Sequence, residues 1–143
     1  MDRSYIERNQ TQTARLRALT ACTDAQLAQP LGEHWTVGAA LAHLGYWDLR
    51  GIGALEAWRR YDLPLVFWRG PEGVNDARLP LWRAMVPREA LAQTIRIAET
   101  IDALVASLSD TEIAVVAAQR HRVLERALHR NDHLTEIERA LRP

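Results

Sequence analysis

Apolar side chains recur every three or four residues along most of this chain, and no stretch alternates strictly between apolar and polar residues. The first spacing is typical of amphipathic helices, and strict alternation is typical of half-buried strands. We therefore predict four helices, over about 4–28, 36–60 and 87–109, and from a start between 110 and 119 to about 141. Four amphipathic helices predict an all-α four-helix bundle. A length of 143 residues fits one domain, residues 1–143.

Two local signals stand out in the second predicted helix. Thr36 is predicted to be its N-cap, since threonine is favoured at that position. The helix also contains four glycines, Gly38, Gly45, Gly51 and Gly53. Glycine lowers helix propensity, so we expect packing against another helix, at close approach, to hold this segment.

The segment between the second and third predicted helices is rich in residues that break helices. Residues 61–86 contain three prolines and two glycines, Pro64, Gly70, Pro71, Gly73 and Pro80. We predict a long connection here, with a short helical turn around 76–84. A connection of this length inside a compact domain is uncommon and is often functional.

Charge and residue usage narrow the classes of function. The 18 basic and 18 acidic residues cancel, and no basic stripe is visible, so we expect no nucleic-acid partner. Every basic residue is an arginine, which excludes mechanisms that need a lysine Schiff base or a P-loop lysine. Cys22 is the only cysteine, so an internal disulfide and a thiolate metal cluster are excluded.

The sequence also predicts the cellular compartment of the protein. The N-terminal stretch is polar, without an apolar signal region. No apolar run approaches the length needed to span a membrane. With a single cysteine, which suits a reducing compartment, the chain is expected to be cytoplasmic and soluble, with no membrane partner.

The histidines are the strongest chemical signal. His129 and His133 stand four residues apart, so on a helix their imidazoles lie one turn apart on the same face. They fall to the side of the apolar stripe of their helix, and His43 falls at one edge of its own stripe. Histidines at the edges of two stripes can meet in a groove and hold a metal ion with open positions. Spacing alone leaves open that the pair is solvated, that His43, His34 and His121 are structural, and that His34 is an additional ligand.

Two segments resemble a known family. Residues 34–44, His-Trp-Thr-Val-Gly-Ala-Ala-Leu-Ala-His-Leu, resemble the Trp-Thr-Val…Leu-x-His-Leu segment of the DinB/YfiT-like family. Residues 127–137 are similar to the His-x-x-x-His-Leu-x-x-Ile helix of that family. The resemblance covers nearly the whole chain in length and helix order. It implies a four-helix bundle and a metal ion, often nickel or zinc, held by His43 from the second helix and by His129 and His133 from the fourth.

The resemblance also implies a class of reactions. The family includes transferases and isomerases that use low-molecular-weight thiols such as bacillithiol or mycothiol. Its maleylpyruvate isomerase branch is described by a His-Glu-His ligand set, whereas this chain has His129 four residues before His133. The departure argues against isomerase activity and leaves a thiol-dependent transferase as the favoured expectation.

Other residues are candidates for the surroundings of such a site. Trp47, Arg50, Asn75 and Asp76 are predicted to line the mouth of the pocket for a small-molecule substrate. Among them, Arg50 is suited to a bidentate contact with an anionic group. Ligating histidines usually donate their second N–H to a carboxylate or carbonyl. Three carboxylates lie near enough in the sequence to be considered as such acceptors, Asp48, Glu125 and Glu136.

Three classes of function remain open at this point. The first is a metal-dependent, thiol-dependent S-transferase, and the second is a hydrolase that uses the same ligands to activate water. The third is a non-enzymatic helical protein that binds a small molecule or forms a homodimer, as related proteins often do. A zinc-peptidase motif is excluded because Arg130 stands where its general base would be, and no serine nucleophile elbow is present.

Overall fold

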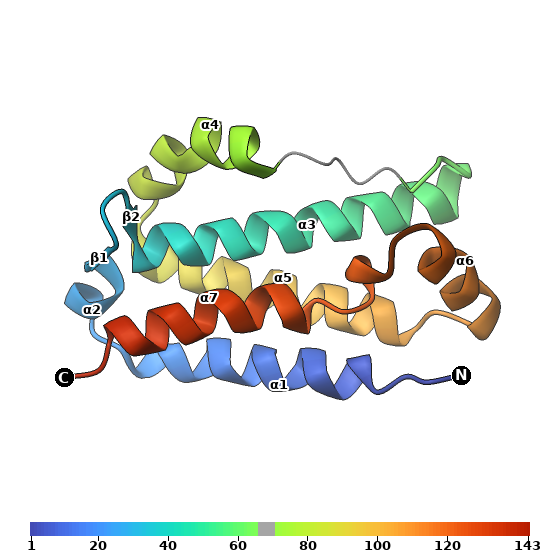
Figure 1. Cartoon of the computed structure of the whole chain (residues 1–143), viewed down its shortest axis with the longest axis horizontal. Coiled ribbons are helices and arrows are strands. Elements are labelled where there is room, and N and C mark those ends of the chain that lie inside the picture. Colours follow the sequence, from blue (N-terminus) through green and yellow to red (C-terminus); the bar gives the residue numbers. More distant parts are fainter. Residues whose placement is uncertain (66–70) are drawn as a thin grey trace.

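The computed structural model describes residues 1–65 and 71–143, and this part of the chain is almost entirely helical (Figure 1). Its elements are α1 (Tyr5–Ala18), the 3-10 helix η1 (Leu19–Ala21), α2 (Asp24–Ala28), β1 (Pro30–Leu31), β2 (Trp35–Thr36), α3 (Val37–Tyr61), α4 (Pro71–Ala84), α5 (Pro87–Ala106), α6 (Asp110–Arg120), the 3-10 helix η2 (His121–Val123) and α7 (Ala127–Ala140). The expected all-α class is confirmed. The helices α1, α3, α5 and α7 lie side by side: α1 packs on α5 and α7, and α3 also packs on both.

The first predicted helix is interrupted. The continuous helix expected over 4–28 is wrong, because α1 ends at Ala18 and α2 begins at Asp24. Thr23 accounts for the break: its side chain accepts a hydrogen bond from the Gln26 backbone, and the Gln26 side chain accepts one from the Thr23 N–H. Such a capping box starts a new helix. The short antiparallel pair β1–β2 follows and turns the chain towards α3.

The predicted start of α3 is confirmed. The hydroxyl of Thr36 accepts a hydrogen bond of 3.1 Å from the Ala39 N–H. Close packing of α3 against α5 is also confirmed, because a Cβ built on Gly45 would lie only 2.7 Å from Oγ1 of Thr94. Gly53, by contrast, faces open space. The glycines on one side of α3 therefore let α5 approach closely.

The connection after α3 is more ordered than expected. The predicted turn around 76–84 is part of α4, a helix of 14 residues with Pro80 inside it. Burial explains the helix, since Trp82 is buried against Ala39, Ala42 and Ala90 of the neighbouring helices. Residues 66–70 of the predicted connection lie outside the described residues.

The last predicted helix is also divided. A single helix from the 110–119 region to 141 was expected, but the chain forms α6, the short η2 and then α7. The buried Asn9 side chain satisfies the backbone at the break: it donates to the Leu124 carbonyl and accepts from the Ala127 N–H, each at 2.8 Å. The third helix was predicted correctly, with Pro87 in its first turn.

A buried polar network divides the apolar interior. One apolar cluster includes Leu44 and Leu134, and a second includes Ile52 and Val123. Between them lies Arg130, which is fully buried and bonds to side chains or backbone of α1, α3 and α5. This arginine therefore joins α7 to α1, α3 and α5. Among the described residues, no helix is both long and apolar enough to cross a bilayer.

Candidate metal centre

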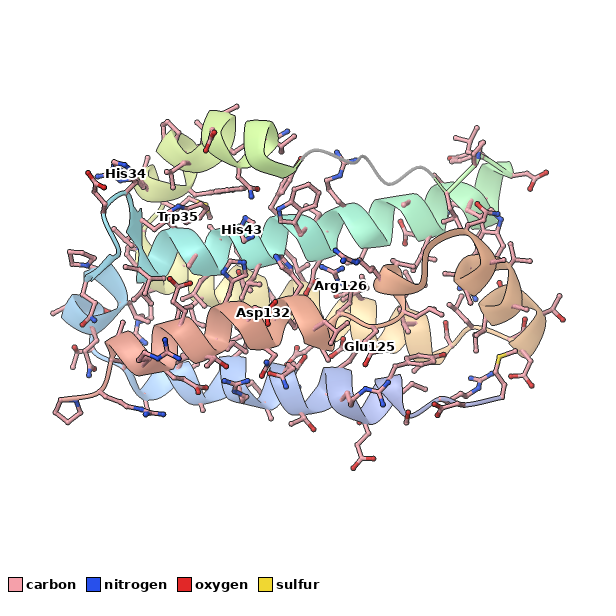
Figure 2. All side chains as sticks on the ribbon, viewed as in Figure 1. His34, Trp35, His43, Glu125, Arg126 and Asp132 are labelled. Atoms are coloured by element: carbon pink, nitrogen blue, oxygen red, sulfur yellow. The ribbon has the colours of Figure 1, made fainter. Side chains whose placement is uncertain are left out.

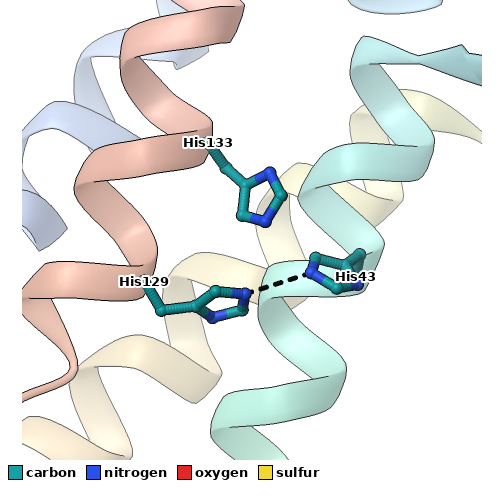
Figure 3. A group of neighbouring side chains, drawn as sticks. All are labelled: His43, His129 and His133. Atoms are coloured by element: carbon teal, nitrogen blue, oxygen red, sulfur yellow. Dashed lines mark hydrogen bonds between the residues drawn. The ribbon is translucent and has the colours of Figure 1, made fainter. Parts of the chain in front are cut away.

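Three histidines from two helices converge between α3 and α7 (Figure 3). Nε2 of His43 lies 3.1 Å from Nε2 of His129. The ring of His133 completes a nearly equilateral triangle, with centroids 4.7 Å from His43 and 4.9 Å from His129. One nitrogen from each ring lies within 4.8 Å of the others. The structure therefore brings together the three residues that the sequence predicted as ligands.

The local structure explains this convergence. His129 and His133 share one face of α7 because four residues make just over one helical turn. His43 is in the second turn of α3 and is only 3% exposed, with the other two rings partly buried beside it. The Arg130 network holds α7 against α3 at this level through the Asp48 carboxylate. Backbone packing, more than the histidines themselves, sets where the rings meet.

The spacing of the nitrogens fits a divalent ion. With metal–nitrogen distances of about 2.0–2.1 Å, neighbouring nitrogen ligands of a tetrahedral or octahedral ion lie roughly 2.9–3.4 Å apart. The 3.1 Å between His43 and His129 falls in this range. A ring nitrogen of His133 lies within 4.8 Å of the nitrogens of both other histidines. A modest rotation of the His133 side chain would bring this nitrogen to the same metal ion. Three imidazole ligands leave further positions for a substrate.

The protonation of the site also suits metal binding. Burial, with a smaller effect of His133, lowers the pKa of His43 from 6.5 to about 3. Burial and the Arg126 guanidinium lower the pKa of His129 to about 2. Burial also lowers the pKa of His133 below its ordinary value. All three imidazoles are therefore neutral at pH 7, the form in which histidine ligates a metal.

An aromatic wall covers His43 on the side away from α7. Its ring stands edge-on to Trp35 and Trp82, with centroids 5.5 and 5.1 Å away, and Trp47 lies at 6.4 Å. Trp35 comes from β2, where Figure 2 shows it near His43, and Trp82 comes from α4, so both elements contribute to the burial of His43. Sequence reasoning assigned neither tryptophan to the site, and the predicted loop over 61–86 concealed the position of Trp82.

The four residues predicted to line the substrate pocket do not all lie in one place in the structure. Trp47 lies beside His43, and its indole donates a hydrogen bond of 3.1 Å to Oδ1 of Asn75. Arg50 is exposed and its guanidinium lies 5.8 Å from the Trp47 ring centroid. Asp76 instead lines an open surface cavity of about 480 Å³ together with His34, and none of the three clustered histidines lines it. Asp76 thus belongs to a different surface from the metal centre.

His34 does not join the cluster. The His34 side chain is 70% exposed and lies 3.8 Å from a carboxylate oxygen of Glu33. The His34 ring therefore faces solvent, away from the three clustered histidines. The side chain of His121 lies outside the described residues.

The expected carboxylate partners do not contact the ligands directly. Glu125 pairs with Arg8, and Glu136 is exposed. Asp48 is buried, but it accepts hydrogen bonds from Arg126 at 2.7 Å and from Arg130 at 2.9 Å. Arg126 in turn places Nη2 3.4 Å from Nδ1 of His129. The carboxylate therefore reaches the site only through an arginine.

Sequence analysis did not assign Arg126 or Arg130 to the surroundings of the site, although the sequence contains a signal for Arg130. Arg130 stands three residues after Ala127 and four before Leu134, inside the apolar stripe of α7. Asp48 occupies the matching place between Leu44 and Ile52 in α3. A charge inside an apolar stripe indicates a buried ion pair. No comparable signal marks Arg126.

Comparisons of this chain with protein-family models, with curated proteins and with solved structures give no match.

Proposed function

We propose that this protein is a metal-dependent enzyme of the DinB/YfiT-like type, a four-helix bundle with zinc or nickel on His43, His129 and His133. The observation that carries the proposal is the convergence of three neutral imidazoles from two helices within 4.8 Å. The two sequence motifs that resemble the family contain these three residues. A cytoplasmic location and a homodimeric state belong to the same proposal.

The favoured reaction is a thiol-dependent S-transfer that uses a low-molecular-weight thiol. A bound divalent ion stabilises the thiolate form of a sulfur ligand, and the thiolate is the nucleophile. The three histidines hold the ion without adding charge, which leaves its positive charge available to that ligand. The aromatic wall of Trp35 and Trp82 limits the access of water to His43.

The side of the site near Trp47 is the proposed place for the second substrate. Trp47 presents its ring close to His43 and is fixed by its hydrogen bond to Asn75. Arg50, whose guanidinium lies over that ring at 5.8 Å from its centroid, is the proposed contact for an anionic group of the substrate. These residues suit an electrophile with an apolar body and a negatively charged end.

A thiol-consumption assay tests the proposal. Metal-loaded protein is incubated with a panel of electrophiles and a low-molecular-weight thiol, and the metal-free protein is the control. We expect consumption that needs both the ion and the thiol. Turnover that proceeds equally without any thiol supports the hydrolase instead, and loaded protein that turns over no substrate supports the non-enzymatic function.

A further inference from the structure

The environment of His129 differs from that of an ordinary metal ligand. Ligating histidines usually donate their outer N–H to a carboxylate or carbonyl, which raises the basicity of the ligating nitrogen. Nε2 of His129 faces His43, so Nδ1 is its outer nitrogen. The group that Nδ1 faces is the Arg126 guanidinium, 3.4 Å away. A cation with only donor groups therefore occupies the place of the usual acceptor.

Arg126 is held in this place by its other contacts. Its Nε donates to Oδ1 of Asp48 at 2.7 Å, and its Nη1 donates to the Arg122 carbonyl at 3.2 Å. The Arg126 side chain is 11% exposed, and Asp48, at 1%, is fixed from its other side by Arg130. Figure 2 shows Arg126 where α7 begins, beside α3. The guanidinium is thus part of the packed interior and not a mobile surface group.

The hydrogen-bond partners of His129 determine which of its two ring nitrogens carries the proton in the neutral form. A guanidinium can only donate, so Nδ1 of His129 accepts and the ring proton lies on Nε2. The Nε2–H then donates to Nε2 of His43, which explains their 3.1 Å separation. A metal ion that binds Nε2 of His129 must displace this proton. If the proton moves to Nδ1, it meets the N–H groups of Arg126.

From these contacts we infer that Arg126 is a positioning residue that opposes metal binding through His129 and so limits the affinity of the centre for a divalent ion. This inference rests on the proposed metal site. The positive charge of Arg126 acts in the same direction, since it lies 3.4 Å from the His129 ring and repels a cation bound to that ring. An ion in this centre is therefore expected to be held less tightly than by three histidines with carboxylate or carbonyl acceptors.

Metal affinity measured by competition with a chromogenic chelator tests the inference, with zinc and nickel as probes. Arg126→Gln removes the charge and supplies an amide oxygen that can accept from Nδ1, so its affinity is expected to rise about tenfold, the lower end of outer-shell effects. Arg126→Lys keeps the charge and is expected to remain near the wild-type affinity. Arg122→Gln removes an exposed charge four residues earlier, in η2, and is the matched control. A loss of packing lowers affinity, so a rise in the glutamine variant alone distinguishes positioning from structural support.

Unchanged or lower affinity in a folded Arg126→Gln protein overturns the inference, as does an equal rise in Arg122→Gln. Wild-type protein that binds neither ion refutes the proposed function itself, so the two failures are distinguishable. A second measurement needs no variant. Nitrogen NMR shifts of the metal-free wild type are expected to show the His129 proton on Nε2, and a proton on Nδ1 contradicts the inference.

Discussion

Nε2 of His43 and Nε2 of His129 lie 3.1 Å apart, although 86 positions separate the two residues in the chain. In the metal-free protein, the Nε2–H of His129 donates to Nε2 of His43 at this distance. The same distance suits two neighbouring nitrogen ligands of one metal ion. The contact depends on α3 and α7 keeping one register, which the buried Arg130 network fixes.

Loss of Arg130 is expected to cost about 3–5 kcal/mol of unfolding free energy, the usual effect of breaking a buried ion pair. Its removal leaves the buried Asp102 without a cation, while Asp48 keeps Arg126. Urea unfolding of Arg130→Met at pH 7 measures the change. Arg17→Met, in a more exposed pair with Glu99, is the control and is expected to change stability by less than about 1 kcal/mol. Similar losses in the two variants would contradict the role of the network.

The close approach of α3 and α5 predicts opposite effects at two glycines of one helix. Gly45→Ala places a methyl group 2.7 Å from Oγ1 of Thr94 and is expected to destabilise the fold by about 1–3 kcal/mol. Gly53→Ala enters open space and is expected to stabilise it by up to about 1 kcal/mol, because alanine favours the helix. Thermal unfolding of both variants measures the difference. A stabilised Gly45→Ala protein would show that α5 is not packed this closely.

Asn9 is expected to be essential for the start of α7. Asn9→Ala leaves the Leu124 carbonyl and the Ala127 N–H without their side-chain partner, and each unsatisfied buried group costs about 1–3 kcal/mol. Gln10→Ala, at the exposed neighbouring position, is the matched control. Denaturant unfolding compares the two, and equal stability of both variants would argue against the cap.

Stability of the metal-free protein is expected to fall as the pH decreases below about 6.5. The unfolded chain binds protons on His43 and His129 near that value, whereas the folded pKa values are about 3 and about 2. Above pH 6.5 the two histidines therefore do not lower the free energy of unfolding. Below pH 6.5 each lowers it by up to about 1.4 kcal/mol per pH unit. Urea unfolding from about pH 8 to about pH 5 measures this slope.

His129→Gln is expected to reduce that slope by about one proton's worth, whereas His34→Gln, at an exposed ring, should leave it unchanged. If both variants keep the wild-type slope, the buried histidines do not control the acid response.

The sequence predicted the site better than it predicted the connections. The clustering of the three histidines could be predicted, because spacing in a helix places His129 and His133 on one face and the family resemblance pointed to His43 as their partner. The two helix breaks could not be found from periodicity, since the Asn9 contacts that satisfy one of them come from more than a hundred residues away. Likewise, burial of Trp82 stabilises α4. The prolines and glycines of this segment had instead predicted a long connection. The Arg126 contact with His129 depends on side-chain geometry that no residue pattern records.

Metal content of tag-free protein, loaded under metal-replete conditions and then dialysed, tests the central claim most directly. We expect about one divalent ion per chain in the wild type, and its loss in His43→Ala, His129→Ala and His133→Ala, because two remaining imidazoles hold an ion only weakly. His34→Ala is expected to retain the ion. Wild-type protein with far less than one ion per chain, or a His43→Ala variant that binds as tightly as wild type, would contradict the account.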